Sequence, residues 1–522
     1  MSSLPKPSNN QPINYPFPLQ FKAYISSFIL FFLLLSSCSH AQRQRVGSPY
    51  QVVDSLLYVP IDSSYSFINY DSNRLIFFDD STQMRRFSAK WHRVLSSGQG
   101  NVVIMQIGAS HVQGGTFPHQ IRRNILLGAR RSLQGSAVEG TFPFASRGLL
   151  FPYSAAVKCN NPFDYRVSRS HPLALTRNVY KEPAEFLGLA GIAVTASDST
   201  AQIGFSLSDP DLRFATTSVV LLGHSRGGVI PRLRVNCSDS LLSPDSINLP
   251  LRRYYYHLSS SVDSLAVILP CDSGQSFALT GLFLENSLPG ITYHSVGVNG
   301  ASVSDYLNKC PYFTSDLRLA KPDLVIFGIG INDAAGPNYD SALFRQRYLA
   351  LVDSIRAVSP DCALVFITNN DSYRRVKRRY HVNNNGPLVR EAFFRIARES
   401  GGMVWDQFSI MGGLNSMKTW TANGLGQKDR VHFTRRGYQL LGDLFSNALF
   451  SAIELCRPVP KQPPAPQPVD SVPRRSETLD SQQPDDSSKL KKDKRKTPRI
   501  YQKPADRKKN NSDNEGLIYI SY

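Results

Sequence analysis

Four apolar runs along the chain each end in glycine, asparagine or aspartate. They are NVVIMQIGAS (101–110), ITYHSVGVNG (291–300), PDLVIFGIGIND (322–333) and CALVFITNND (362–371). Nearly continuous apolar runs of this length are typical of parallel strands that are covered on both faces. Because ligands bind such sheets at the carboxyl ends of the strands, the polar end of each run is a candidate site position.

Helical patterns lie between or after these runs, at residues 339–358, 387–400 and 434–453. Strands that alternate with helices predict a doubly wound α/β sheet. A different pattern fills residues 161–286, where short alternating or β-branched runs are separated by Ser, Asp, Gly and Pro. Several short strands at regular spacing predict a β-sandwich. Since this block follows the first α/β strand and precedes the second, we interpret it as an inserted domain.

The N-terminal residues 1–38 have the pattern of an export signal. Lys22 precedes an apolar run of about 15 residues, which is too short for a transmembrane helix, and small residues follow it. The last four residues, LSSC, resemble a bacterial lipobox, in which Cys38 is lipidated and becomes the new N-terminus. The alternative is ordinary cleavage after Ala41. Lipidation predicts an exported lipoprotein of the periplasm or outer membrane, held at the membrane by its anchor.

Residues 457–522 are proline-rich and then lysine-rich, and they contain much of the formal net charge of +19. We expect a disordered tail, because such a segment cannot bury enough apolar surface to offset its ordering entropy. No zinc-finger spacing, aromatic–basic RNA motif or Walker loop accompanies the charge. A solvated basic tail is therefore favoured over a nucleic-acid-binding surface.

Six cysteines follow Cys38, and none of them forms a CxxC pair, so the sequence predicts no metal site. Export would permit disulfides, and Cys237 with Cys271 is the first pair to test. Six buried thiols are the alternative.

Ser225 lies in a Gly-x-Ser-x-Gly motif, GHSRG, behind an apolar run. In α/β-hydrolases this motif places the nucleophile on a turn between a strand and a helix. Here Pro231 follows almost at once, and RLRVNC (232–237) alternates as a strand does. We therefore expect a β-hairpin turn and reject Ser225 as a nucleophile.

Four other blocks carry the groups that serine hydrolysis needs: a nucleophile, a base, a carboxylate that orients the base, and donors for the oxyanion. In chain order they are GASH (108–111), GVNGAS (297–302), GIGIND (328–333) and DRVHF (429–433). Three stand at the ends of predicted strands, and the fourth precedes the last predicted helix.

These blocks resemble those of the SGNH (GDSL-type) hydrolases. The resemblance implies that Ser110 is the nucleophile and that Asp429 and His432 form the base pair. It implies an oxyanion hole made by Gly300 and Asn332 beside the Ser110 backbone N–H. The three-residue offset fits this assignment, because one turn can present a carboxylate and an imidazole to the same point. The family's usual Gly-Asp-Ser is Gly-Ala-Ser here, so Ala109 replaces a carboxylate that helps to shape the nucleophile loop.

The likeness extends over roughly residues 71–455, through stretches such as SRGLLFPYSAA (146–156) and NNPFDY (160–165). These stretches look like bacterial envelope proteins akin to peptidoglycan O-acetylesterases. The resemblance implies a three-layer α/β/α, flavodoxin-like parallel sheet from residues 42–160 and 287–456. It also implies that the inserted β-sandwich of residues 161–286 is similar to a carbohydrate-binding module.

The expected function is therefore an exported esterase that removes O-acetyl groups from a cell-wall or other polysaccharide through an acyl-enzyme on Ser110, without metal or organic cofactor. A lipase, an aryl esterase or an O-acetyltransferase on the same triad is an alternative. An inactive carbohydrate-binding surface lipoprotein is another, supported mainly by Ala109. The insert should lie beside the catalytic mouth, where Tyr254 to His257 either contact sugar or pack the sandwich.

Overall fold

The computed structural model describes residues 57–458, except 134–145, 160–161, 163, 183, 208–211, 213 and 237. The expected signal, with Cys38 and Ala41, and residues 459–522 of the expected tail lie outside the described residues. Within the described ranges, none of the helices has the length and apolar character that crossing a membrane requires.

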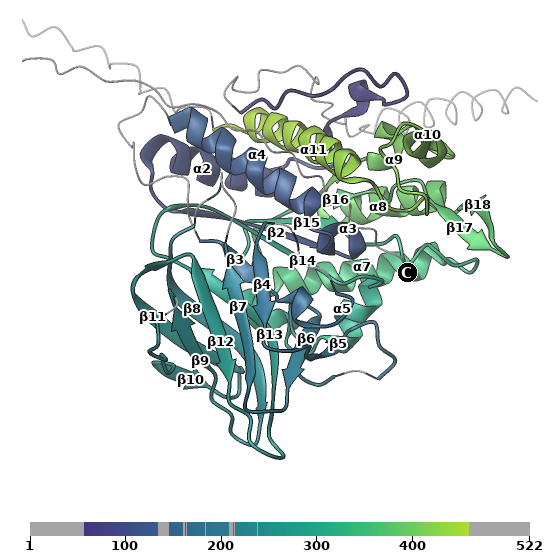
Figure 1. Ribbon diagram of the computed structural model, residues 1–522. Helices are drawn as coiled ribbons and strands as arrows, with labels where there is room; N and C mark the ends of the chain where they lie inside the picture. The colour runs from purple at the N-terminus through teal and green to yellow at the C-terminus, as the bar shows by residue number, and fades with distance from the viewer. Residues whose placement is uncertain are drawn as a thin grey trace, which may run out of the picture. The chain divides into compact units, whose positions relative to one another are not determined.

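The central sheet has six strands and contains all four predicted runs (Figure 1). Its order is β1 (Leu75–Phe77), β19 (Met403–Trp405), β16 (Ala363–Ile367), β15 (Leu324–Gly328), β2 (Asn101–Gly108) and β14 (Gly290–Gly297). The strands from β19 to β14 are parallel, whereas β1 pairs with β19 antiparallel. The expectation of a parallel sheet is corrected to a mixed one, because the three-residue edge strand β1 is too short to show a sequence pattern.

Helices cover both faces of this sheet and make three layers (Figure 1). On one face lie α2 (Thr82–Ser97), α4 (Thr116–Leu133) and α11 (Arg435–Leu455), and on the other α5 (Val303–Lys309), α6 (Phe313–Ala320), α7 (Ser341–Arg356) and α8 (Gly386–Ser400). The three helices predicted from the sequence are α7, α8 and α11. Short helices complete this part: η1 (Tyr70–Ser72), α3 (Ser110–Gln113), α9 (Gln407–Ile410) and α10 (Ser416–Ala422).

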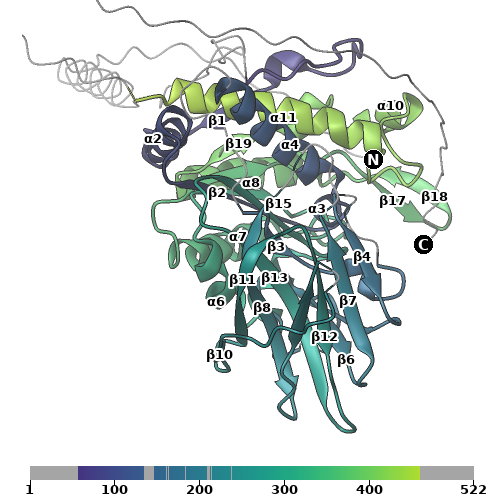
Figure 2. The ribbon, with the colours of Figure 1, turned by 60° about the vertical axis from the view of Figure 1, so that its left-hand side comes forward.

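Two antiparallel sheets lie between β2 and β14 in the chain, in the region where the sequence predicts short strands (Figure 2). The seven-stranded sheet contains β10 (Ser246–Asn248), β11 (Arg253–Val262), β8 (Thr216–Arg226), β13 (Ser276–Glu285), β6 (Ile192–Ala196), β5 (Ala174–Arg177) and β3 (Gly148–Leu150), which pairs with β13. The four-stranded sheet contains β4 (Arg166–Arg169), β7 (Ala201–Ser206), β12 (Ser264–Leu269) and β9 (Arg232–Val235). A short helix, η2 (Tyr153–Ala155), follows β3, so elements of this region begin before residue 161.

Two tyrosines of the YYYH stretch pack inside the protein. Tyr254 and Tyr256 in β11 are buried; the Tyr254 ring contacts Phe277 edge-on, and the Tyr256 hydroxyl donates to the Pro231 carbonyl. Alternate residues are buried because successive side chains of a β-strand point to opposite faces of the sheet. For these two tyrosines the packing alternative is correct, and contact with sugar is not.

The described cysteines are buried. Cys159, Cys271, Cys310 and Cys362 are free thiols, and Cys456 is also buried. Cys237 lies outside the described residues, and the free Cys271 thiol gives its suggested pairing with Cys237 no support.

Candidate active site

Ser110 stands at the carboxyl edge of the central sheet, immediately after β2. The register aligns Gly108 with Gly297 of β14 and with Gly328 of β15, so three glycines meet at one level of adjacent strands. A β-carbon on Gly297 would lie 2.6 Å from the Ala109 carbonyl oxygen. Glycine is therefore required where the nucleophile loop crosses the sheet edge.

The nucleophile loop has its own supports, although Ala109 stands where the SGNH pattern has an aspartate. Ala109 is fully buried. The Tyr306 hydroxyl donates to the Gly108 carbonyl at 3.1 Å, and the Gln113 side-chain oxygen accepts from the Asn299 backbone N–H at 2.7 Å. These bonds join the block around Ser110 to the block around Gly300.

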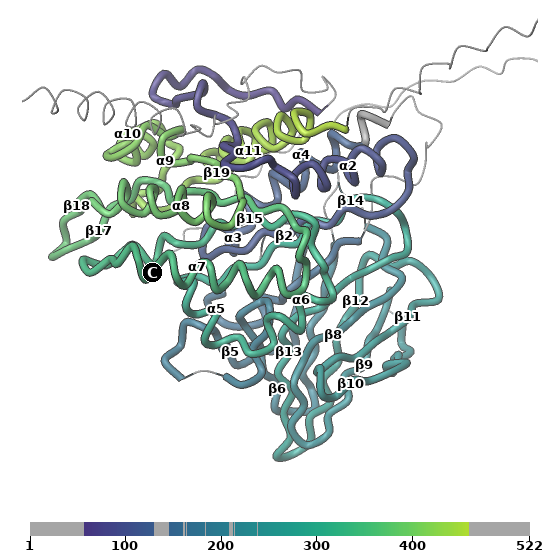
Figure 3. The backbone as a smooth tube through the Cα atoms, turned by 180° about the vertical axis from the view of Figure 1, so that it is seen from behind, coloured from purple at the N-terminus to yellow at the C-terminus, as the bar shows by residue number. Residues whose placement is uncertain are grey.

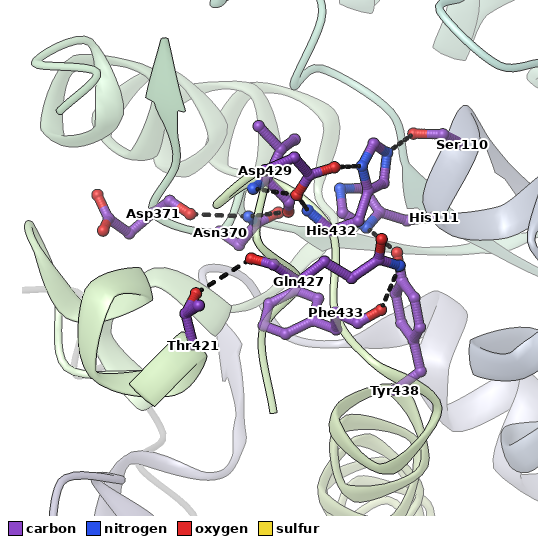
Figure 4. Close-up of polar contacts among 11 residues, drawn as sticks. Ser110, His111, Asn370, Asp371, Thr421, Gln427, Asp429, His432, Phe433 and Tyr438 are labelled. Atoms are coloured by element: carbon purple, nitrogen blue, oxygen red, sulfur yellow. Dashed lines mark hydrogen bonds and ion pairs between the residues drawn. The ribbon is translucent and has the colours of Figure 1, made fainter. Parts of the chain in front are cut away.

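Ser110, His432 and Asp429 form one hydrogen-bonded chain (Figure 4). Ser110 Oγ lies 2.7 Å from His432 Nε2, and His432 Nδ1 lies 2.7 Å from Asp429 Oδ2. Ser110 begins α3, whereas the other two come from the loop before α11. This geometry allows His432 to accept a proton from the serine hydroxyl while a carboxylate fixes its tautomer.

A tight turn presents Asp429 to His432. Asp429 Oδ1 accepts the backbone N–H groups of Val431 at 2.9 Å and His432 at 3.0 Å, and Arg430 between them has φ 56°. Burial would raise the pKa of the Asp429 carboxyl, but the His432 side chain and these backbone donors outweigh it and hold that pKa below its usual range. Asp429 is therefore ionised at neutral pH.

Asn332 and Gly300 lie on neighbouring loops. Asn332 Nδ2 donates to the carbonyl of Ala301 at 2.9 Å, which uses one of its two amide hydrogens and leaves the other available. The Val303 backbone N–H donates to the Asp333 carboxylate, which also ties the loop after β15 to the loop after β14. Gly300 has φ 87°, in the left-handed region, and it is exposed.

His111 is a neighbour of the triad whose position the sequence analysis did not identify. Its ring centre lies 5.1 Å from that of His432, and its Nδ1 lies 2.7 Å from the Tyr438 hydroxyl (Figure 4). Burial, with the His432 charge, lowers the pKa of His111 to about 3, so the ring is neutral. It lines a small pocket of about 30 Å³. Its position next to Ser110 in the sequence was the signal that could have identified it. Sequence spacing, however, does not tell which way the imidazole ring points.

Ser225 lies inside β8, paired with Phe277 of β13. The turn comes after it, at Gly227 and Gly228, which both have positive φ, and the next element is β9. Rejection of a strand-to-helix nucleophile turn is therefore correct. The expectation of a β-hairpin is wrong, because β8 and β9 belong to different sheets and the turn leads from one sheet to the other.

The chemistry of the site rests on the triad and its polar neighbours. In the part of the chain that the structure describes, no group of three or more His, Cys, Asp or Glu residues could hold a metal ion.

Comparison with known proteins adds a family match over part of the chain and a fold. The model of the GDSL-like Lipase/Acylhydrolase family matches residues 272–440, which include Gly300, Asn332, Asp429 and His432. No curated protein matches the chain.

A solved structure described as "Peptidoglycan O-acetylesterase in action" matches with TM-score 0.58 and 22% identity, over 73% of this chain and 99% of that one. An acetyl xylan esterase, AlAXEase, matches with TM-score 0.24 and 17% identity, over 30% of this chain and 79% of that one. A family two carbohydrate esterase from Cellvibrio japonicus matches with TM-score 0.24 and 9% identity, over 56% of this chain and 98% of that one. The first match shows the fold of this chain.

Proposed function

We propose that this member of the SGNH (GDSL-type) hydrolases, a carboxylic ester hydrolase, removes O-acetyl groups from a polysaccharide. The observation that carries the proposal is the hydrogen-bonded chain from Ser110 through His432 to Asp429. The similarity to the solved structure with TM-score 0.58, a peptidoglycan O-acetylesterase, supports an acetylated glycan as substrate.

The reaction proceeds in two halves. His432 takes the Ser110 proton through Nε2 as Oγ attacks the acetyl carbonyl carbon, and Asp429 stabilises the resulting imidazolium. The Ser110 and Gly300 backbone N–H groups and the second Asn332 amide hydrogen stabilise the oxyanion. His432 then protonates the departing sugar oxygen, which leaves an acetyl ester on Ser110. Water, deprotonated by His432, attacks this ester and releases acetate and free serine.

Ser110→Ala tests this proposal. It should lower kcat by several orders of magnitude on acetylated xylan, acetylated peptidoglycan and a chromogenic acetate ester, with the fold intact by circular dichroism. Ser225→Ala is the matched control and should leave activity within about twofold, since Ser225 lies inside a strand. Loss of activity in the control but not in Ser110→Ala would refute the assignment.

The antiparallel sheets form, in this proposal, an inserted β-sandwich that borders the catalytic mouth. A β-carbon on Gly300 would lie 3.9 Å from Val179 Cγ1, just after β5. The next residue, Tyr180, is 38% exposed; the Arg177 guanidinium lies 5.2 Å from its ring centre, and Lys309 Nζ donates to its carbonyl. Tyr180 thus follows directly the residue that lies near the oxyanion loop, and an exposed, supported ring is suited to packing on a sugar face.

Export and anchoring are also part of the proposal. The LSSC stretch that ends at Cys38, after a short apolar run, supports lipidation of that cysteine. Lipidation would hold the esterase at the cell envelope, where acetylated polysaccharides are found.

A further inference from the structure

A strongly basic hairpin stands out among the surfaces that the mechanism does not use. It consists of β17 (Tyr373–Val376) and β18 (Arg379–Val382), and we call residues 373–382 the basic hairpin. Its ten residues, YRRVKRRYHV, contain five Lys or Arg residues and no Asp or Glu. Residues 375–381 are all exposed. The hairpin projects beyond α8 in opposite views (Figures 1 and 3).

The turn of the basic hairpin places cations where the backbone disfavours them. Val376 pairs with Arg379, so Lys377 and Arg378 form a two-residue turn, with φ 45° and 66°. Glycine, asparagine or aspartate is preferred at such positions, because other residues are strained there. Strain kept in a solvent-exposed turn indicates a functional reason for the side chains, which here are two positive charges at the tip.

One side of the basic hairpin is attached to the catalytic turn. The Arg430 guanidinium lies 4.9 Å from the ring centre of Tyr373 and 5.4 Å from that of Tyr380. The Tyr373 backbone N–H donates to the Arg430 carbonyl at 3.0 Å. Arg430 follows Asp429 directly, and it adds a sixth cation between the hairpin and the triad.

The other attachment leads to the oxyanion side of the site. Just after β18, Asn383 Nδ2 donates to the Ala334 carbonyl at 3.0 Å. Asn385 Nδ2 donates to the carbonyls of Ala334 at 2.9 Å and Gly336 at 2.8 Å. These carbonyls lie on the loop that carries Asn332. The hairpin is therefore fixed to both loops that border the reacting atoms, and a chain bound on it would lie at the catalytic mouth.

We propose that the basic hairpin binds the carboxylates of an anionic polysaccharide and so holds the acetylated chain across the active site. The inference rests on the proposed esterase function and narrows its substrate to a carboxylate-bearing glycan. Guanidinium groups pair with carboxylates in a bidentate geometry, and a cluster of one sign raises the local concentration of a charged ligand. Attachment to the catalytic loops favours a substrate chain over a membrane surface, which need not approach Ser110.

Binding and hydrolysis are tested separately on the full chain. The hairpin variant is R375Q/K377Q/R378Q/R379Q, which leaves the partly buried Arg374 in place. The matched control is R85Q/R93Q/R318Q/R395Q, which removes the same charge at four exposed positions of α2, α6 and α8, outside the antiparallel sheets. Both sets retain the C-terminal tail, so any difference between them comes from the hairpin.

Binding is measured by calorimetry with unacetylated polygalacturonate, in the Ser110→Ala background. The hairpin variant should raise Kd about tenfold or more at low salt, and about 0.5 M salt should remove most of the difference, since exposed pairs are weak and screened. The control should bind like the parent. Equal affinities of the hairpin variant and the parent for polygalacturonate would overturn the proposal. The proposal would also be overturned if the hairpin variant lost binding only to vesicles of phosphatidylcholine with phosphatidylglycerol.

Hydrolysis is measured with Ser110 intact. The hairpin variant should lose about tenfold in kcat/KM on an acetylated polyuronate and stay within about twofold on a small neutral acetate ester. An equal loss on both esters would overturn the proposal. If the parent hydrolyses no ester at all, the esterase function fails, and the polygalacturonate measurement still decides whether the hairpin binds the glycan.

Discussion

Replacement of Asp164 by asparagine should strongly destabilise the protein. Asp164 Oδ2 accepts from Arg122 at 2.7 Å and from Arg147 at 2.6 Å, and all three side chains are at most 4% exposed. Arg122 also donates to the Tyr293 carbonyl of β14 and to the Ser295 hydroxyl. The cluster therefore joins α4 and the central sheet to the segments that precede β3 and β4.

The magnitude follows from burial. Burial, with the charge of Arg147, lowers the pKa of Arg122 to about 10, so it stays protonated at neutral pH. Asp164→Asn then leaves two buried guanidinium groups without a counter-charge, which costs about 3–5 kcal/mol. For a folded unit of roughly 400 residues, that loss lowers Tm by about 4–6 °C. Asp62→Asn, at the exposed pair with Arg436, should leave Tm unchanged.

Thermal unfolding across pH gives the decisive measurement. Burial alone would raise the pKa of Asp164, but Arg147 and Arg122 outweigh it and hold that pKa well below its usual range. Its stabilisation is therefore present above the unfolded-state pKa of about 4 and is lost only as pH falls towards the folded-state pKa. The difference between wild type and Asp164→Asn should be constant from about pH 5 to 8 and narrow below about pH 4. A difference no larger than that of Asp62→Asn, or one that changes between pH 5 and 8, would refute this reasoning.

Two further outcomes are expected. Cys38→Ala should move the protein from the membrane fraction to the soluble one, because lipid chains on that cysteine provide the anchor; unchanged fractionation on an immunoblot would indicate cleavage after Ala41 or an uncleaved anchor. Tyr180→Ala should raise KM for an acetylated polymer several-fold and leave KM for a small acetate ester unchanged, because Tyr180 follows Val179, whose side chain lies near Gly300, but is not part of the triad. Tyr58→Ala, at a tyrosine that is 51% exposed, is the control, and an equal effect of Tyr180→Ala on both substrates would contradict a sugar-binding role.

The sequence predicted the parts of the fold whose signals are local and long. The strands β2, β14, β15 and β16 were visible because each is a continuous apolar run that ends in turn residues. The edge strand β1 and its neighbour β19 were missed, since three residues such as LIF or MVW carry no period that separates a strand from any other apolar triplet.

The candidate site was accessible for a similar reason. Strand ends and the three-residue offset of Asp429 and His432 are fixed by the local backbone, and the structure brings these residues to Ser110. Contacts that arise from tertiary packing could not be predicted from the sequence. His111 and the support of Gly108 by Tyr306 depend on elements that are distant in the chain.

The basic hairpin was missed because its turn breaks the rule by which hairpins are recognised. A Lys-Arg pair at φ 45° and 66° gives no Asn-Gly or Asp-Gly signal, so the stretch resembles a solvated charged loop. The concentration of charge in the tail also hid this second cluster within the folded part. Sites where sequence rules fail are expected to be functional or strained, and this turn is strained, exposed and attached to the loop that carries Asp429. The unusual turn residues and the cluster of positive charges thus both indicate that the basic hairpin is a functional surface.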